Sequence, residues 1–218
     1  NVVLRTLGIA ACVTVLCTIL AIPMAFYMAK IAKPGTQKIL VALILTPLWA
    51  SYLVKIYAWR TMLEPGTGVL DWLLGPIGFQ SPGFGGPAII IGLSYLWLPY
   101  MILPLYASLE RLDPTLDEAA MDLGSRPARV FLDVTLPQSI PGIIAGGMLV
   151  FIPAAGELVI PTLVGDAGSP MIGRLISDEF SQARDWPMAA AIAVALLVLM
   201  VGPTMIYSRY QAKAEGST

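Results

Sequence analysis

Five stretches of this sequence are apolar over a length close to that needed to cross a lipid bilayer. A helix needs about 20 consecutive, mostly apolar residues to cross the hydrocarbon core. The five stretches therefore predict an all-α integral membrane protein, a polytopic helix bundle with five spans in this chain. They cover residues 6–29, 39–63, 87–108, 140–164 and 187–207.

The composition also indicates lipid rather than water as the main surrounding of the chain. Of the 218 residues, 57% are hydrophobic and 12% are charged, and the mean hydropathy is +0.77. A soluble domain of this length is much less apolar. The net charge of −1 argues against a nucleic-acid partner. The only cysteines, Cys12 and Cys17, lie within the first apolar stretch and are expected as small core residues.

No motif in the sequence indicates chemistry of its own. The chain has no His, the usual general base and the commonest metal ligand. It also has no Gly-Lys dipeptide, and therefore no P-loop for ATP. Nucleophile-elbow, zincin and metal-spaced Cys patterns are absent as well. We therefore expect no catalytic residue, no cofactor and no metal site in this chain, and a function based on conformational change.

Residues 109–139 form a polar island between two apolar stretches and carry their own folding signals. Asp113 is suited to cap a helix that starts at the following proline. Gly124 is suited to the left-handed residue that ends this helix. Ser125 is then expected to cap a second short helix, which Pro137 closes. The island is thus predicted to be two short helices joined at a glycine, projecting from a membrane.

The same island contains a rigidly spaced motif. Glu118-Ala119-Ala120 is followed by three residues, Gly124, nine residues, the aliphatic Val134, one residue and Leu136-Pro137. This pattern resembles the cytoplasmic loop signature of binding-protein-dependent ABC importer permeases, which usually have Ile where Val134 stands. An ordinary helical hairpin between two spans would explain the helix caps but not the distal Leu136-Pro137.

The resemblance implies the type I ABC importer permease fold and a loop that docks into a groove of a separate ATPase. The docking role would fall on the residues of the motif. Small alanines allow close approach, the glycine sets the angle between the helices, and the glutamate offers a charge to the partner. The expected coupling residues are Glu118, Ala119, Ala120, Gly124, Leu136 and Pro137.

Lys and Arg residues in the short loops give the expected orientation, because they are in excess on the cytoplasmic side. The side expected to be cytoplasmic carries Lys30, Lys33, Lys38, Arg111, Arg126, Arg129, Arg209 and Lys213. We therefore predict a transmembrane domain over residues 1–210, a cytoplasmic coupling loop at 109–139 and a cytoplasmic tail at 211–218. This places Asn1 outside, so one further span is expected upstream of it.

Glu157 is the clearest candidate for a residue on a solute pathway. Ionisable groups within a membrane span are costly and are functional candidates by default. Glu157 follows a weak point in the fourth span, where Pro153 and the run 154–156 are expected to break the helix. Alternatively, Glu157 pairs with Lys55 or caps the broken helix.

Aromatic residues supply the other pathway candidates. Tyr52, Lys55 and Trp59 share one helical face of the second span, and Trp97 and Tyr100 share a face of the third. Aromatic faces together with a carboxylate suit an organic cation. Packing aromatics and an interfacial belt are the alternative. In the fourth span, a face of glycines is expected to allow close helix contact; it consists of Gly142, Gly146 and Gly147.

Several local strings resemble the putrescine/spermidine branch of these permeases. They are residues 54–59, 151–161, 171–174 and 184–187. The resemblance implies a bacterial inner-membrane subunit paired with a second, homologous permease. It also implies a pair of ABC ATPase subunits that bind the ATP, and a periplasmic polyamine-binding protein that delivers the solute.

Three alternatives to a polyamine importer were open at the level of sequence. An ABC importer of another solute, such as a ferric ion or an organic anion, would share the scaffold. An ion-coupled secondary transporter would need no Glu-Ala-Ala loop, and the sequence has no inverted repeat of broken helices. An intramembrane enzyme is disfavoured because the chain has no His and no recognisable nucleophile.

Overall fold

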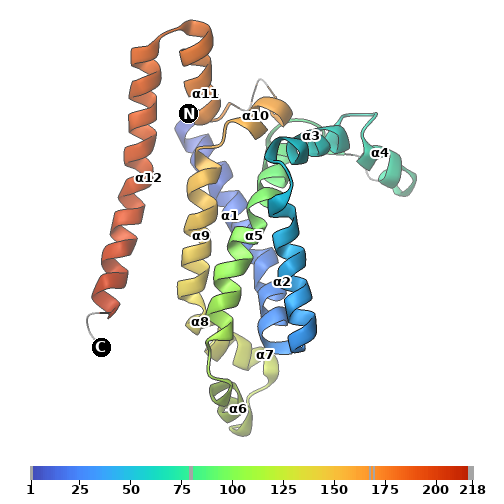
Figure 1. The fold of residues 1–218 in the computed structure, drawn as a ribbon, viewed down its shortest axis with the longest axis vertical. Helices are drawn as coiled ribbons and strands as arrows, with labels where there is room; N and C mark the ends of the chain where they lie inside the picture. Colours follow the sequence, from blue (N-terminus) through green and yellow to red (C-terminus); the bar gives the residue numbers. More distant parts are fainter. Residues whose placement is uncertain (1, 79–80, 167, 169, 216–218) are drawn as a thin grey trace. The chain divides into compact units, whose positions relative to one another are not determined.

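The computed structural model describes residues 2–78, 81–166, 168 and 170–215. Every regular element of these residues is helical, which confirms the predicted all-α class (Figure 1). The elements are α1 (Val2–Phe26), η1 (Tyr27–Ile31), α2 (Pro34–Trp49), α3 (Tyr52–Leu63), α4 (Val69–Leu74), η2 (Gly75–Ile77), α5 (Gly86–Glu110), α6 (Pro114–Asp122), α7 (Pro127–Val130), η3 (Phe131–Thr135), α8 (Leu136–Gln138), α9 (Ile140–Ala155), α10 (Val159–Val164), α11 (Ile172–Asp178), η4 (Glu179–Ala183) and α12 (Trp186–Glu215).

The chain divides into two compact units. The first consists of Asn1–Ala10, Trp59–Ile90 and Ile152–Thr218. The second consists of Ala11–Ala58 and Ile91–Phe151. Helices α1, α3, α5 and α9 each contribute residues to both units. The whole polar island therefore belongs to the second unit, together with the parts of α5 and α9 that adjoin it.

Two helices are long and apolar enough to cross a membrane, namely Val2–Ile31, which joins α1 to η1, and α5. Two further candidates are bent pairs: α2 meets α3 at 91°, and Pro127–Gln138 meets α9 at 63°. If each bent pair is one span, the described residues supply up to four spans by length and composition. The expected count of five stays a prediction, because the apolar part of α12, Trp186–Gly202, is a shorter helix.

The second apolar stretch, expected as one span over 39–63, is two helices. Helix α2 begins earlier than expected, since Pro34 occupies its first turn and is not part of a loop. The chain leaves the helix at Ala50, which is extended, with φ −72° and ψ 143°. This removes the helical donor for the carbonyl of Pro47, and Lys55 Nζ supplies a replacement at 3.1 Å.

The helix of the fourth apolar stretch breaks after its run of small residues and not at its proline. Pro153 lies inside α9, and the break falls at residues 156–158, after which α10 begins at Val159. A proline inside a membrane helix is tolerated when neighbouring groups satisfy the freed carbonyl. The predicted weak point is therefore present, and Gly156 rather than Pro153 marks it.

Within the second unit, α5 and α9 approach each other at backbone distance. A Cβ atom on Gly142 would lie 2.5 Å from Ser108 Cβ and 3.0 Å from the carbonyl oxygen of Pro104. One on Gly146 would lie 2.6 Å from Met101 Sδ and 3.1 Å from the carbonyl oxygen of the same residue. The predicted glycine face therefore allows close helix contact at these two positions.

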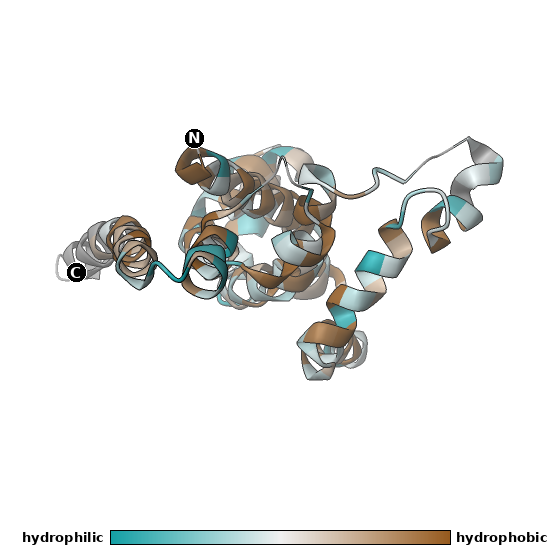
Figure 2. Cartoon of the chain, turned by 90° about the horizontal axis from the view of Figure 1, so that it is seen from above, coloured by the Kyte–Doolittle hydropathy of each residue, from teal (hydrophilic) through white to brown (hydrophobic). Residues whose placement is uncertain are grey.

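The apolar surface of the long helices is extensive, as expected of helices that face lipid. The helices of the apolar stretches are brown over much of their length in Figure 2. A soluble protein rarely exposes so many large apolar side chains next to one another. Among the exposed side chains of α1 and α12 are Val15, Ile19, Leu20, Met24, Val194, Leu197 and Val198.

Candidate functional site

Helix α6 of the polar island begins where the sequence predicts. Asp113 is its N-cap, and Asp113 Oδ1 accepts a hydrogen bond from the backbone N–H of Thr115 at 3.0 Å. This hydrogen bond lowers the pKa of the Asp113 carboxyl from its ordinary value. Pro114 fills the first helical position, where its missing N–H costs nothing. The start of the helix is thus determined by local sequence.

Helix α6 also ends as predicted. Gly124 has a φ of +87°, in the left-handed region that favours glycine. Around it the chain closes back on the helix. The N–H of Gly124 donates to the carbonyl of Met121 at 2.8 Å, and that of Ser125 donates to the carbonyl of Ala120 at 3.1 Å. These bonds satisfy carbonyls that the end of the helix leaves open.

The second helix of the island differs from the prediction at both ends. Arg126, not Ser125, is its N-cap, because Pro127 takes the first helical position. Pro137 does not close the helix, since it lies in the first turn of α8, where proline is tolerated. The chain is helical from Pro127 to Gln138 and turns by 63° before α9. The prediction treated Pro137 as a stop, but in this context it is compatible with the helix.

The motif residues are largely accessible. Glu118, Ala119, Gly124 and Pro137 are exposed, whereas Ala120 and Leu136 are partly buried. Three exposed apolar side chains on α6 and the turn after it were not predicted as part of the site. Apolar residues within such a charged segment could have indicated them. Leu116 is 46% exposed, Met121 is 44% exposed and Leu123 is 88% exposed. The island therefore presents small, apolar and acidic groups together, a surface suited to a protein partner.

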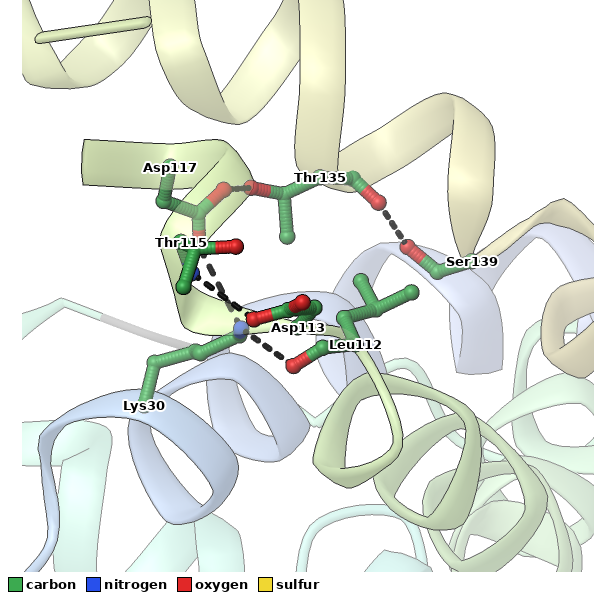
Figure 3. Close-up of polar contacts among 7 residues, drawn as sticks. All are labelled: Lys30, Leu112, Asp113, Thr115, Asp117, Thr135 and Ser139. Atoms are coloured by element: carbon green, nitrogen blue, oxygen red, sulfur yellow. Dashed lines mark hydrogen bonds and ion pairs between the residues drawn. The ribbon is translucent and has the colours of Figure 1, made fainter. Parts of the chain in front are cut away.

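A polar network ties this island to the end of the first apolar stretch (Figure 3). Lys30 Nζ, from η1, lies 3.2 Å from Asp117 Oδ2, from α6. Thr135 Oγ1, from η3, donates to Asp117 Oδ1 at 3.1 Å. Ser139 Oγ in turn donates to the carbonyl oxygen of Thr135. This network was not predicted from the sequence, where Lys30 is only one of the basic residues that indicate the cytoplasmic side.

Glu157 caps the helix that follows the break in the fourth apolar stretch. Its Oε1 accepts hydrogen bonds from the backbone N–H groups of Leu158 at 3.1 Å and Val159 at 3.0 Å. Its side chain is buried, with 8% exposure. Gly173 of α11 packs directly on its backbone, since a Cβ there would lie 2.5 Å from the Glu157 carbonyl oxygen. The capping interaction foreseen as an alternative for Glu157 is present.

The aromatic candidates lie on two helices. Tyr52, Lys55 and Trp59 all lie on α3, beyond the bend, and each is partly exposed. On α5 the rings of Trp97 and Tyr100 pack together, with centroids 5.3 Å apart and planes tilted by 53°. The two rings of the α5 pair are therefore in contact, and the three α3 residues share one helix. Trp97 Nε1 is buried and has no hydrogen-bond partner within the described residues.

Comparison with known protein families identifies the class of the chain. Residues 8–213 match the family described as "Binding-protein-dependent transport system inner membrane component". The chain belongs to this family. The resemblance carried by the Glu-Ala-Ala loop is therefore confirmed at the level of the family. Members of such a system work with a binding protein, and this chain is its inner-membrane component.

Relatives with similar sequences match nearly the whole of this inner-membrane component. It is 38% identical to the inner membrane ABC transporter permease protein YdcU of Escherichia coli (strain K12), over 92% of this chain and 68% of the relative. It is 39% identical to the spermidine/putrescine transport system permease protein PotB of Haemophilus influenzae, over 96% of this chain and 74% of the relative. PotB of Escherichia coli (strain K12) is 36% identical, over 96% and 77% of the two chains.

Solved structures of more distant proteins share the fold of this inner-membrane component. A bacterial ABC transporter that imports the acidic polysaccharide alginate has a TM-score of 0.73 at 19% identity, over 95% of this chain and 78% of that one. An amino acid ABC transporter solved with histidines has a TM-score of 0.62 at 18% identity, over 96% and 91%. The fold class predicted from the sequence, that of ABC importer permeases, is confirmed.

Proposed function

We propose that this chain is a permease subunit of an ATP-driven importer of polyamines in the bacterial inner membrane. The observation that carries the solute class is the identity of 36–39% with two spermidine/putrescine permease proteins PotB over 96% of the chain. Polyamines are flexible cations, so they need negative or aromatic partners along their path. The path is proposed to include Glu157, the α3 trio and the α5 pair.

The chain is proposed to work without ATP chemistry of its own. Separate ABC ATPase subunits would bind and hydrolyse the nucleotide, and a second, homologous permease would complete the passage. A periplasmic binding protein would deliver the solute. The exposed surface of α6 and Gly124 supports this division of roles, because it combines small and apolar groups with the carboxylate of Glu118 on a polar island.

Uptake by the reconstituted importer tests this function. The chain, its second permease and the ATPase subunits are placed in proteoliposomes, and the binding protein is added with radiolabelled spermidine or putrescine. We expect uptake that requires both ATP and the binding protein. The proposal would be contradicted if uptake continued with an inactive ATPase but stopped when an ion gradient across the membrane was dissipated. Selective uptake of a ferric ion or an organic anion instead would contradict the solute class alone.

Glu157 is proposed to assist the cation through its charge as well as to cap α10. Replacing Glu157 by Gln keeps an oxygen that can accept the two backbone hydrogen bonds, but it removes the negative charge. We therefore expect membrane abundance near that of the parent and a KM for spermidine that rises on the order of tenfold, equivalent to about 1.4 kcal/mol. Initial uptake rates over a range of spermidine concentrations measure this.

Two further variants separate the capping role from the role of the charge. Glu157→Ala removes the cap as well, which typically costs about 1 kcal/mol, so its abundance should fall below that of Glu157→Gln. Glu64→Gln, at an exposed carboxylate of the same unit, is the matched control and should leave the KM unchanged. An unaltered KM in Glu157→Gln, with normal abundance, would leave Glu157 as a capping residue only.

A further inference from the structure

The contact between Lys30 and Asp117 differs in kind from the other ion pair of the polar island. The side chains of Lys30 and Asp117 are 15% and 22% exposed, whereas those of Arg129 and Asp133 are 78% and 63% exposed. Both pairs have the same separation of 3.2 Å. Exposed pairs contribute about 0–1 kcal/mol, since water and salt screen them. The partly buried pair is screened less, and it joins segments that are far apart in the sequence.

Asp117 is held from two sides. One carboxylate oxygen faces Lys30, and the other accepts the hydrogen bond from Thr135 Oγ1 (Figure 3). Lys30 Nζ also donates to the carbonyl oxygen of Leu112 at 3.4 Å, in the connection that leads into α6. The threonine is 2% exposed, so its hydroxyl depends on Asp117 for a buried partner. A single carboxylate on α6 thus connects η1 and η3.

The same junction has an apolar contact and unusual helix geometry. Phe26, at the end of α1, packs edge-on against Phe131 of η3, with ring centroids 5.0 Å apart. Both η1 and η3 are π-helical. Such segments are rare and are frequent at functional sites. Ser139, which donates to the carbonyl of Thr135, lies at the 63° bend that leads into α9.

We propose that Lys30, Asp117 and Thr135 form a latch through which a displacement of α6 moves α1 and α9. The three are positioning residues for coupling, and the proposal rests on the proposed docking of the polar island to an ATPase. Asp117 directly precedes Glu118, so a force applied by the ATPase at the motif acts next to the latch. Along the chain, α6 is joined to its neighbours by the short connections at residues 111–113 and 123–126, one of which contains the flexible Gly124.

Uptake and ATP hydrolysis measured in the same proteoliposomes test the latch. Lys30→Met removes the ammonium group, and Thr135→Val removes the hydroxyl at nearly constant shape. In both variants we expect spermidine taken up per ATP hydrolysed to fall on the order of tenfold. The subunits should remain assembled and the ATPase active, since the motif surface is intact. A combined Arg129→Met and Asp133→Asn variant is the matched control and should keep the parental ratio.

Charge exchange distinguishes a latch from a general structural contribution. Lys30→Asp and Asp117→Lys should each lower the uptake per ATP, and the double variant should recover a large part of it. A purely structural role would lower abundance, uptake and hydrolysis in parallel and would leave the ratio unchanged, which would overturn the latch. An unchanged ratio in Lys30→Met at normal abundance would overturn it as well.

The latch and the function on which it rests fail in different ways. If Gly124→Asp abolishes uptake but Lys30→Met does not change the ratio, only the latch is wrong. If Gly124→Asp leaves uptake normal, the docking role of the polar island is wrong, and the latch fails with it. The two variants are therefore measured side by side in the same preparation.

Discussion

Replacing Gly124 by Asp is expected to abolish solute uptake by the assembled importer while the helices stay inserted in the membrane. Gly124 has a φ of +87°, and a Cβ built on it meets nothing within 4 Å in this chain. The added Cβ therefore causes no clash with the described residues, and Asp is one of the few residues that visit this conformation. What changes is the surface offered to the ATPase, which gains bulk and a negative charge.

Uptake in proteoliposomes and thermal unfolding of the purified complex check this prediction. We expect uptake to fall at least tenfold and the backbone penalty to stay within about 1–2 kcal/mol. Gly78→Asp is the matched control, since Gly78 also has a positive φ, of 79°, and open space where a Cβ would lie. Its uptake should resemble that of the parent. Normal ATP-dependent uptake in the Gly124 variant would contradict the assigned coupling surface.

Placing alanines at both Gly142 and Gly146 is expected to remove most of the protein from the membrane. The added methyl groups would lie 3.0 Å and 3.1 Å from carbonyl oxygens of α5, at Pro104 and Met101. Backbone atoms cannot move aside as a side chain can, so the helices must separate. Overpacking typically costs about 1–3 kcal/mol at one site, and two sites on one contact place the variant near the limit of a marginally stable fold.

Immunoblots of membrane fractions and the melting temperature of the purified complex measure this loss. Gly147→Ala is the control on the same helix. Its methyl group would lie 3.6 Å from Thr14 Cγ2, an ordinary van der Waals distance. We expect its abundance to match that of the parent. Equal abundance of the double variant would mean that α5 and α9 separate at little cost, against the close contact described above.

Features determined by neighbouring residues could be predicted from the sequence. The N-cap at Asp113, the left-handed Gly124 and the break at residues 156–158 each depend on a few adjacent side chains. The family could be predicted because the Glu-Ala-Ala motif joins seven named positions at fixed spacing between Glu118 and Pro137. Local chemistry and a long motif are the two kinds of signal that one sequence carries well.

Features determined by contacts between distant segments could not be predicted. The bend after Trp49 involves the bond from Lys55 to a carbonyl one helix earlier, which no periodicity reveals. Pro137 was expected to stop a helix, but the same residue type also fits the first turn of one. The contact of Lys30 with Asp117 requires that the end of the first apolar stretch return to the polar island. Only the folded chain contains that information.

The contact of α9 with α5 has a mechanical consequence. At Gly142 and Gly146 the backbone of α9 lies close to the carbonyl groups of Pro104 and Met101, as well as to the side chains of Ser108 and Met101. A contact between long side chains can absorb a small displacement by changing χ angles, whereas the backbone part of this contact cannot. We therefore expect the described parts of α5 and α9 in the second unit to move together when the bend at Ser139 moves.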